Sequence, residues 1–224
     1  MKIRLWATAL LALGLGSLVV ITAWPPALVS AAAAPDTGRV SIHKMGGDID
    51  VPNAPGGADL ATMGGNIHIG NAGDSVSAKT MGGDIVIEHA NGSVDVSTMG
   101  GKIILRQVAG AVHASTMAGD VTVHFTGASS GRREIHLSSL AGAILLTVPK
   151  DYGMDVRIKL EYTKNSSQDY RVAQHLGLTE RQSADWDLSR GTPRKYIYVT
   201  GRVGDGQNRV TIDTINGDVI LKQE

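Results

Sequence analysis

One five-residue pattern recurs along the chain at a fixed interval. It begins with methionine, continues with two small residues and ends with an aliphatic residue, and each copy starts 18 residues after the one before. The copies are MGGDI at Met45, MGGNI at Met63, MGGDI at Met81, MGGKI at Met99 and MAGDV at Met117. A period near 20 residues is typical of solenoids, in which each repeat forms one turn of a coil and stacks on its neighbours.

Apolar and polar residues alternate on both sides of this pattern. Before the methionine, two positions separated by one residue are aliphatic in each repeat, as at Val94 and Val96. After the glycines, two more aliphatic positions follow with the same spacing, as at Ile85 and Ile87. Because side chains two apart on a strand share a face, each repeat is expected to form two short strands with buried aliphatic side chains. The glycine pair is expected to form the corner between them, since glycine adopts backbone angles closed to other residues.

The predicted fold class is therefore all-β: a parallel β-solenoid, or single-stranded β-helix, with 18-residue rungs. The repeat pattern survives five extra residues at positions 127–131 and resumes from Ile135 to Leu146. It returns at the end of the chain, from Val210 to Leu221. An insertion at a corner is compatible with this fold because loops at the surface tolerate added residues.

Two segments between these repeats depart from the pattern. Residues 154–162 alternate as one further strand, whereas residues 163–195 form a polar, irregular excursion with a weak helical pattern around residues 170–178. The whole of residues 35–224 is expected to form one β-solenoid domain, because some 190 residues suffice for a single domain with its own core.

Residues 1–34 resemble a targeting segment. Lys2 and Arg4 precede an apolar run over residues 5–23, and small residues follow it. This order predicts a secretory signal peptide. The apolar run is close to membrane-spanning length, so an uncleaved N-terminal membrane anchor is the alternative. Either reading predicts an extracytoplasmic protein that is periplasmic, secreted or membrane-anchored, and the absence of cysteine leaves its stability to the repeat core.

Charge and aromatic content exclude some classes of partner. Lys and Arg total 21, as do Asp and Glu, and no basic stripe is apparent. This balance argues against a nucleic-acid-binding protein. Aromatic residues make up 4% of the chain, which disfavours a surface that stacks sugars or bases.

The repeated phrases TMGGDI and STMGGKI, together with the ending GRVGDGQNRVTIDTINGDVILK, resemble a bacterial adhesin-like family of β-strand-repeat envelope proteins of unknown function. The resemblance covers roughly residues 38–222 apart from the excursion. It implies a parallel β-solenoid related to the pectate-lyase-like helices, exported or tethered to a membrane. It implies no catalytic residues.

The methionine column is the first candidate for chemistry. Thioethers are suitable ligands for Cu(I), so a copper site is one interpretation. Leu140 and Ile215 occupy the same column in later repeats, which indicates a requirement for bulk rather than for sulfur. We therefore expect the methionines to pack in the core, where methionine is an adaptable filler.

Two polar columns flank the corner. One holds Asp48, Asn66, Asp84, Lys102 and Asp120, and its stacked carboxylates suggest calcium, although Asn66 and Lys102 interrupt them. The other holds Thr62, Thr80, Thr98 and Thr116, which are expected to stabilise the sheet by pairing across strands. Neither column is predicted to be a binding site.

A weak candidate metal site consists of Asp95, His113 and His136. Counting along the columns places the two histidines at equivalent positions of successive repeats, facing outward, with Asp95 one repeat earlier. Groups separated by one strand spacing of about 5 Å could hold zinc or copper. The simpler interpretation is three solvated surface residues, so no metal or cofactor is predicted.

An enzyme is the main rival class, because pectate-lyase-like helices act on acidic polysaccharides. Its catalytic groups would have to come from Asp169, Glu180, Asp185 or Asp187 in the excursion, and nothing distinguishes these residues. We therefore predict a non-catalytic, adhesin-like module that binds an envelope component or a protein partner. Such binding is expected to involve the excursion, because functional residues concentrate on loops held by a rigid scaffold.

Overall fold

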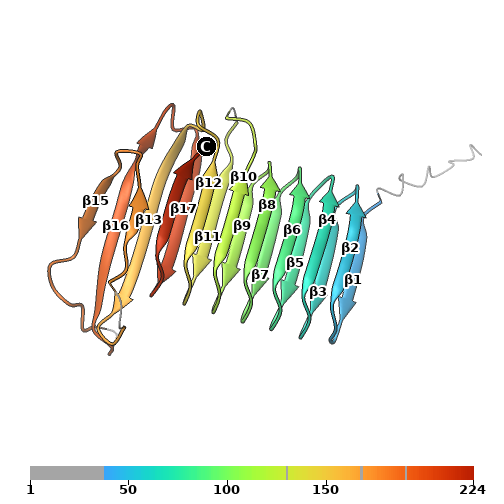
Figure 1. The fold of residues 1–224 in the computed structure, drawn as a ribbon, viewed down its shortest axis with the longest axis horizontal. Helices are drawn as coiled ribbons and strands as arrows, with labels where there is room; N and C mark the ends of the chain where they lie inside the picture. Colours follow the sequence, from blue (N-terminus) through green and yellow to red (C-terminus); the bar gives the residue numbers. More distant parts are fainter. Residues whose placement is uncertain (1–37, 130, 167–168, 190) are drawn as a thin grey trace, which may run out of the picture. The chain divides into compact units, whose positions relative to one another are not determined.

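The computed structural model describes residues 38–224 except 130, 167–168 and 190. These residues form strands and turns without a helix, and the strands belong to two sheets (Figure 1). The predicted targeting segment, residues 1–34, lies outside the described residues. Among the described residues, no helix is long and apolar enough to cross a membrane.

The larger sheet has ten strands, and nearly all neighbours within it are parallel. Their order is β1 (Val40–Lys44), β3 (Ala58–Thr62), β5 (Val76–Thr80), β7 (Val94–Thr98), β9 (Val112–Thr116), β11 (Glu134–Ser139), β17 (Asn208–Ile215), β13 (Met154–Thr163), β16 (Arg194–Val203) and β15 (Thr179–Gln182). Only β16 runs antiparallel to its neighbours β13 and β15.

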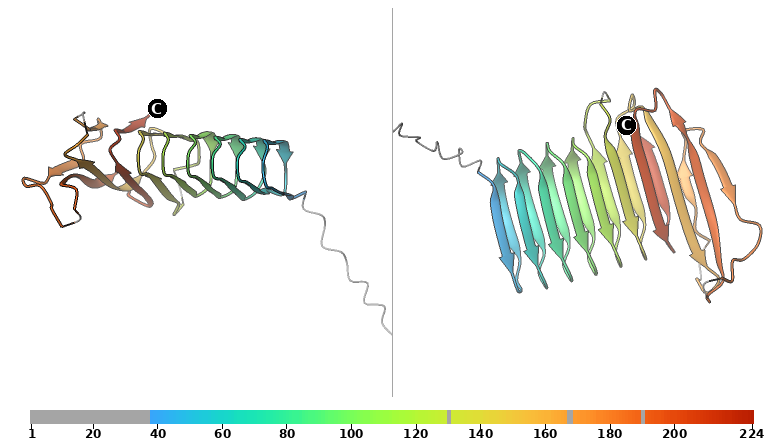
Figure 2. Two further views of the ribbon diagram at one scale, coloured as in Figure 1. Left: turned by 90° about the horizontal axis from the view of Figure 1, so that it is seen from below. Right: turned by 180° about the vertical axis from the view of Figure 1, so that it is seen from behind.

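The smaller sheet has eight strands, all paired in parallel. Their order is β14 (Val172–Gln174), β18 (Val219–Gln223), β12 (Ile144–Val148), β10 (Val121–Phe125), β8 (Ile103–Val108), β6 (Ile85–Ala90), β4 (Ile67–Ala72) and β2 (Ile49–Ala54). Figure 2 shows the two sheets as opposing layers, with the chain crossing from one to the other at each corner.

Strand pairing follows the spacing of the repeats. Val76 of β5 pairs with Val94 of β7, and Val94 pairs with Val112 of β9, so partners lie 18 residues apart. The smaller sheet keeps the same spacing, as in the pairing of Ile67 with Ile85. Regularly spaced parallel strands in two sheets are consistent with a solenoid-like fold, and the all-β prediction is confirmed.

The core lies between the two sheets and consists of the predicted aliphatic columns. Leu60 on one sheet and Ile67 and Ile85 on the other are fully buried, and the buried aliphatic residues form one continuous cluster. At roughly 2 kcal/mol for each buried aliphatic side chain, these columns are the main source of stability.

The second glycine of each pair is required by close stacking of the chain. A Cβ atom on Gly83 would collide with the carbonyl of Gly65, and one on Gly101 would collide with the carbonyl of Gly83. The first glycine of the pair has room, which explains why Ala118 can replace it. The sequence predicted glycine here because of unusual backbone angles, and this explanation holds at Gly47, where φ is 85°. At the later corners glycine is needed because the backbone of the preceding repeat lies too close for a Cβ atom.

The threonines point into the corner and bond to backbone atoms. Thr98 is 4% exposed; its Oγ1 donates to the carbonyl of Gly83 at 2.9 Å and accepts the N–H of Gly101 at 3.2 Å. Thr80 makes the same contacts one repeat earlier, with Gly65 and Gly83. These hydrogen bonds connect successive repeats. The threonines do lie opposite one another across strands, as predicted, and their hydroxyls bond to backbone atoms.

The prediction that the methionines pack in the core is wrong. Met63, Met81, Met99 and Met117 are 46–49% exposed, and Met45 is 85% exposed. The alternation of inward and outward residues continues to the threonine, whose small side chain fills the corner. The methionine one residue later therefore faces outward.

The last repeat is inserted between earlier parts of the chain. β17 lies between β11 and β13, so β13 pairs with β17 on one edge and with β16 on the other. The excursion contains β14, which pairs with β18, and β15, which pairs with β16. The weak helical pattern at residues 170–178 was a wrong prediction, because that segment contains β14.

Candidate functional site

The structure places the predicted histidine pair in register. His113 pairs with His136 on the neighbouring strand, Asp95 pairs with His113, and the two imidazole rings stack with centroids 5.0 Å apart and planes 11° apart. Ring nitrogens in parallel, stacked rings direct their lone pairs side by side instead of toward one ion. Among the described residues, no group of three or more His, Asp or Glu is arranged to hold a metal.

The column of Asp and Asn residues has a structural role. The Oδ1 atom of Asp48 accepts the backbone N–H of Asn66 at 2.7 Å, and Asn66 accepts that of Asp84 at 2.9 Å. In the next repeat, Asp84 Oδ1 accepts the backbone N–H of Lys102 at 2.7 Å. Each side chain thus satisfies a backbone donor of the next repeat, which explains the column without calcium.

Two acidic residues near the excursion serve local structure. Glu161 of β13 is 3% exposed and forms an ion pair with Arg194, which joins the end of the excursion to the sheet. Asp187 accepts a hydrogen bond from the Tyr196 hydroxyl at 3.0 Å and one from the Ser189 backbone N–H at 2.9 Å. These partners explain both carboxylates without a catalytic role.

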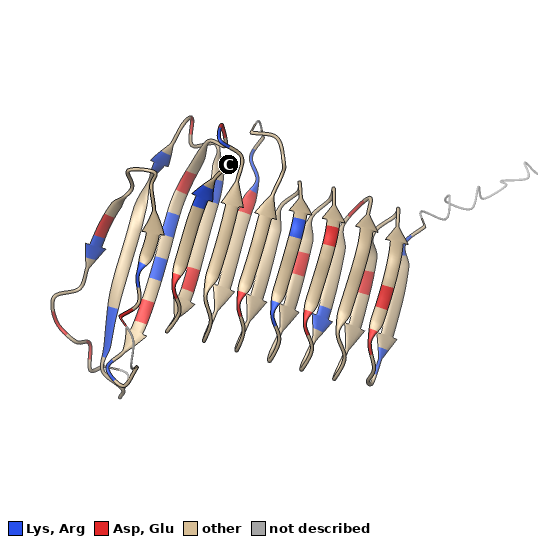
Figure 3. Cartoon of the chain, in the orientation of Figure 1, with Lys and Arg blue, Asp and Glu red and all other residues tan. Residues whose placement is uncertain are grey.

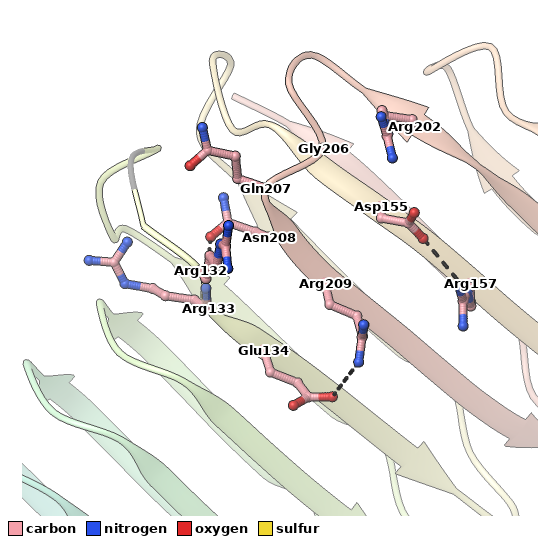
Figure 4. A pocket seen from close by; sticks show the side chains of 10 residues that line it. All are labelled: Arg132, Arg133, Glu134, Asp155, Arg157, Arg202, Gly206, Gln207, Asn208 and Arg209. Carbon is pink, nitrogen blue, oxygen red and sulfur yellow. Dashed lines mark hydrogen bonds and ion pairs between the residues drawn. The ribbon is translucent and has the colours of Figure 1, made fainter.

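The strongest candidate site is a hollow of about 380 Å³ on the outer face of the ten-stranded sheet. We call it the arginine site (Figure 4). Its lining consists of Arg132, Arg133, Glu134, Asp155, Arg157, Arg202, Gly206, Gln207, Asn208 and Arg209. Five arginines and two carboxylates leave a net charge of +3.

The pairing of four strands brings together the residues at the centre of this site. Glu134 of β11 pairs with Arg209 of β17, Arg209 pairs with Asp155 of β13, and Asp155 pairs with Arg202 of β16. All four lie at one level of the sheet, and their charges alternate across it. Arg157 lies two residues farther along β13, on the same face. Figure 3 shows charged residues of both signs on β13 and its neighbours.

The ion pairs within the arginine site are long and exposed. The distance between Arg209 Nη1 and Glu134 Oε1 is 4.0 Å, and the distance between Arg157 Nε and Asp155 Oδ1 is 3.6 Å. Side chains of these four residues are 36–66% exposed. Such pairs contribute at most about 1 kcal/mol each. The guanidinium groups of Arg157 and Arg209 therefore keep N–H donors for a ligand.

Asn208 fixes the loop that carries Arg132 and Arg133. This residue is fully buried, and its Nδ2 donates to the carbonyls of Gly153 at 2.8 Å and Ser129 at 3.1 Å. Its Oδ1 accepts the backbone N–H of Arg133 at 3.0 Å. Asn208 thus connects the inserted loop, β13 and β17, and holds one wall of the site in place.

Tyr152 lies beneath the same wall. Its ring is fully buried and packs against Phe125 with centroids 4.9 Å apart. Burial raises the pKa of Tyr152 to about 12, with a smaller opposing effect from the positive charge of Arg133. The tyrosine is therefore neutral at ordinary pH and acts as an apolar support.

Guanidinium groups recognise carboxylate and phosphate because their N–H donors match pairs of oxygen atoms. Among the described residues that line the site, none is Ser, Thr, Cys, His, Lys or Tyr. The lining thus supplies donors for an anion, with Glu134 and Asp155 as its carboxylates.

Comparisons of the chain with protein-family models, with curated proteins and with solved structures found no match. The resemblance to adhesin-like proteins therefore stays a prediction. Function is therefore inferred from the residues of the site.

Sequence reasoning missed this site because its residues come from three separate segments. Arg132 and Arg133 follow the inserted turn, Arg157 belongs to β13, and Arg202 and Arg209 lie near the end of the chain. The balanced total charge conceals the local excess of arginine. The doublet at residues 132–133 was the available signal, but its partners depend on the pairing of β17 with β11 and β13.

Proposed function

We propose that the protein is a non-catalytic, extracytoplasmic, adhesin-like β-solenoid with 18-residue rungs. Its arginine site binds an anionic group of an envelope polymer or partner. The observation that carries this proposal is a cluster of five arginines, three on the exposed face of β13, β16 and β17 and two on the loop before β11. The rigid sheets supply a fixed spacing for these arginines, which lowers the entropy cost of binding.

The arginine site accounts for binding better than the excursion does. Its lining contains no residue of 163–195, whereas β14 and β15 of the excursion pair with the outer strands β18 and β16. The excursion thus contributes strands to the ends of the two sheets. We therefore expect a ligand to contact the neighbouring sheet face rather than the excursion.

The proposal is tested by isothermal titration calorimetry with two polyanions, polygalacturonate for carboxylate and long-chain polyphosphate for phosphate. The double variant Arg157→Gln/Arg209→Gln replaces two charged guanidinium groups by neutral amides and keeps most of the length of each side chain. Each exposed contact contributes about 1 kcal/mol, so the variant is expected to bind roughly tenfold or more weakly.

Arg106→Gln is the matched control. Arg106 lies on β8 in the other sheet and pairs with Glu88 at 3.0 Å, so its loss removes one positive charge, where the double variant removes two, and leaves the arginine site intact. Binding is expected to weaken by no more than about twofold in this control. Equal losses in both variants, or binding to neither polymer, would contradict the proposal.

The non-catalytic part of the proposal has its own readout. The wild-type protein is incubated with polygalacturonate, and reducing ends and unsaturated products are measured. Binding without product formation is the expected result. Product formation that survives in the Arg106→Gln control and disappears in the Arg157→Gln/Arg209→Gln variant would instead identify an enzyme.

A further inference from the structure

The exposed methionines form a continuous row along one corner of the repeats. We call Met45, Met63, Met81, Met99 and Met117 the methionine ladder. These are five of the seven methionines in the chain, and the chain has no cysteine. Met154, in contrast, is fully buried in β13. A position that is about half exposed does not require a core filler, so the repeated choice of methionine there calls for another explanation.

The ladder places successive thioethers at the spacing of neighbouring strands. The threonines that precede the methionines pair directly, Thr80 with Thr98 and Thr98 with Thr116. The corner itself also stacks, because the N–H of Ala118 donates to the carbonyl of Met99 at 3.0 Å. Adjacent methionine backbones are therefore separated by about 4.8 Å, the distance between hydrogen-bonded strands.

This spacing suits a metal ion bound between two sulfur atoms. Metal–sulfur bonds of roughly 2.3 Å on opposite sides of one ion place the two sulfurs about 4.6 Å apart. Methionine has three flexible side-chain bonds, so each sulfur can adjust its position. Two neighbouring methionines can thus provide a linear site without a change in the backbone.

Thioether sulfur selects the kind of ion. It is uncharged and soft, and it favours Cu(I) over calcium, magnesium and other hard cations. The carboxylates of Asp48 and Asp84 lie three residues after Met45 and Met81 on the same corner and favour a cation nearby. After Met99 this position is Lys102, which lies 3.6 Å from Asp120. We propose that the methionine ladder binds soft monovalent cations, Cu(I) or Ag(I), between thioethers of adjacent repeats.

The test uses the full chain and Ag(I), which has the same ligand preference and needs no reductant. Binding is measured by titration calorimetry, and sulfur ligation by X-ray absorption at the silver edge. The variant Met63→Leu/Met81→Leu/Met99→Leu/Met117→Leu keeps the volume and the apolar surface but removes four sulfurs. Its affinity for Ag(I) is expected to fall by about tenfold or more, with loss of the sulfur signal.

Two further variants keep the test decisive. His113→Gln/His136→Gln removes the two stacked imidazoles and should leave Ag(I) binding unchanged. The single variant Met81→Leu interrupts the ladder with little risk to folding and should lower the number of bound ions. Undiminished binding in the leucine variants, or loss of binding in the histidine variant, would overturn the proposal. A leucine variant that loses a protein partner but keeps Ag(I) would identify the row as an apolar docking surface instead.

Discussion

The buried threonines provide the sharpest test of how successive repeats are joined. Valine at position 98 has nearly the shape of threonine but lacks the hydroxyl. Thr98→Val therefore removes the bond to the Gly83 carbonyl and the bond from the Gly101 N–H, at 2.9 and 3.2 Å. Both glycines are buried, so their polar atoms would lose a partner away from bulk water.

The magnitude follows from those two groups. Leaving a buried donor or acceptor unpaired costs about 1–3 kcal/mol each. The added methyl group of valine recovers roughly 1 kcal/mol of apolar burial. The variant should thus lower the free energy of unfolding by about 3 kcal/mol, the middle of a range of roughly 1–5 kcal/mol. Urea unfolding followed by circular dichroism measures this difference.

Thr98→Ser is the matched control because it keeps the hydroxyl and removes only the methyl group. It is expected to cost about 1 kcal/mol, less than the valine variant. Ordinary packing predicts the opposite order, because valine resembles threonine in shape more closely than serine does. A valine variant as stable as the wild type, or more stable than the serine variant, would refute the role assigned to these hydroxyls.

Three further predictions concern stability. Gly101→Ala should lower the melting temperature strongly, because its Cβ would collide with the carbonyl of the preceding repeat, whereas Gly100→Ala should change it little. Glu161→Gln should cost about 3 kcal/mol in urea unfolding, because it leaves the partly buried guanidinium of Arg194 without its anionic partner. Burial raises the pKa of Tyr152 to about 12, so its contribution to stability is complete below pH 10 and is lost as the pH rises toward 12. Tyr152→Phe should remove that part of the alkaline loss, measured by thermal unfolding at pH 9–12.

Each of these predictions has a contradicting outcome. Similar melting temperatures for the two glycine variants would mean that the corners do not stack closely. A change of less than about 0.5 kcal/mol in Glu161→Gln, as expected for an exposed residue, would mean that its ion pair does not hold the excursion. An identical alkaline transition in wild type and Tyr152→Phe would mean that the buried hydroxyl does not titrate with unfolding.

The sequence alone was sufficient for the strands and for most inward positions. Repetition explains this success, because columns such as the one with Ile67 and Ile85 show the same alternation several times. The methionines were misassigned because the alternation extends one step farther than expected, to Thr62 and its equivalents. Local pattern could not show that a threonine hydroxyl has backbone partners in the corner, since those partners belong to neighbouring repeats.

Long-range pairing limited the prediction of the candidate site. The insertion of β17 between β11 and β13 joins residues more than 50 positions apart, and no local pattern specifies it. That pairing brings Arg209 beside Glu134 and Asp155. The histidine pair, by contrast, was placed correctly, because its two strands are adjacent in the series of repeats, and column counting suffices there.

The location of polyanion binding tests the central proposal most directly. We suggest NMR titration of the protein with polygalacturonate and with polyphosphate, following backbone amides and the arginine Nε–H groups. The largest changes are expected at Arg157, Arg202 and Arg209, with little change at Arg106. Changes confined to residues 163–195, or no change with either polymer, would contradict the assignment of binding to the arginine site.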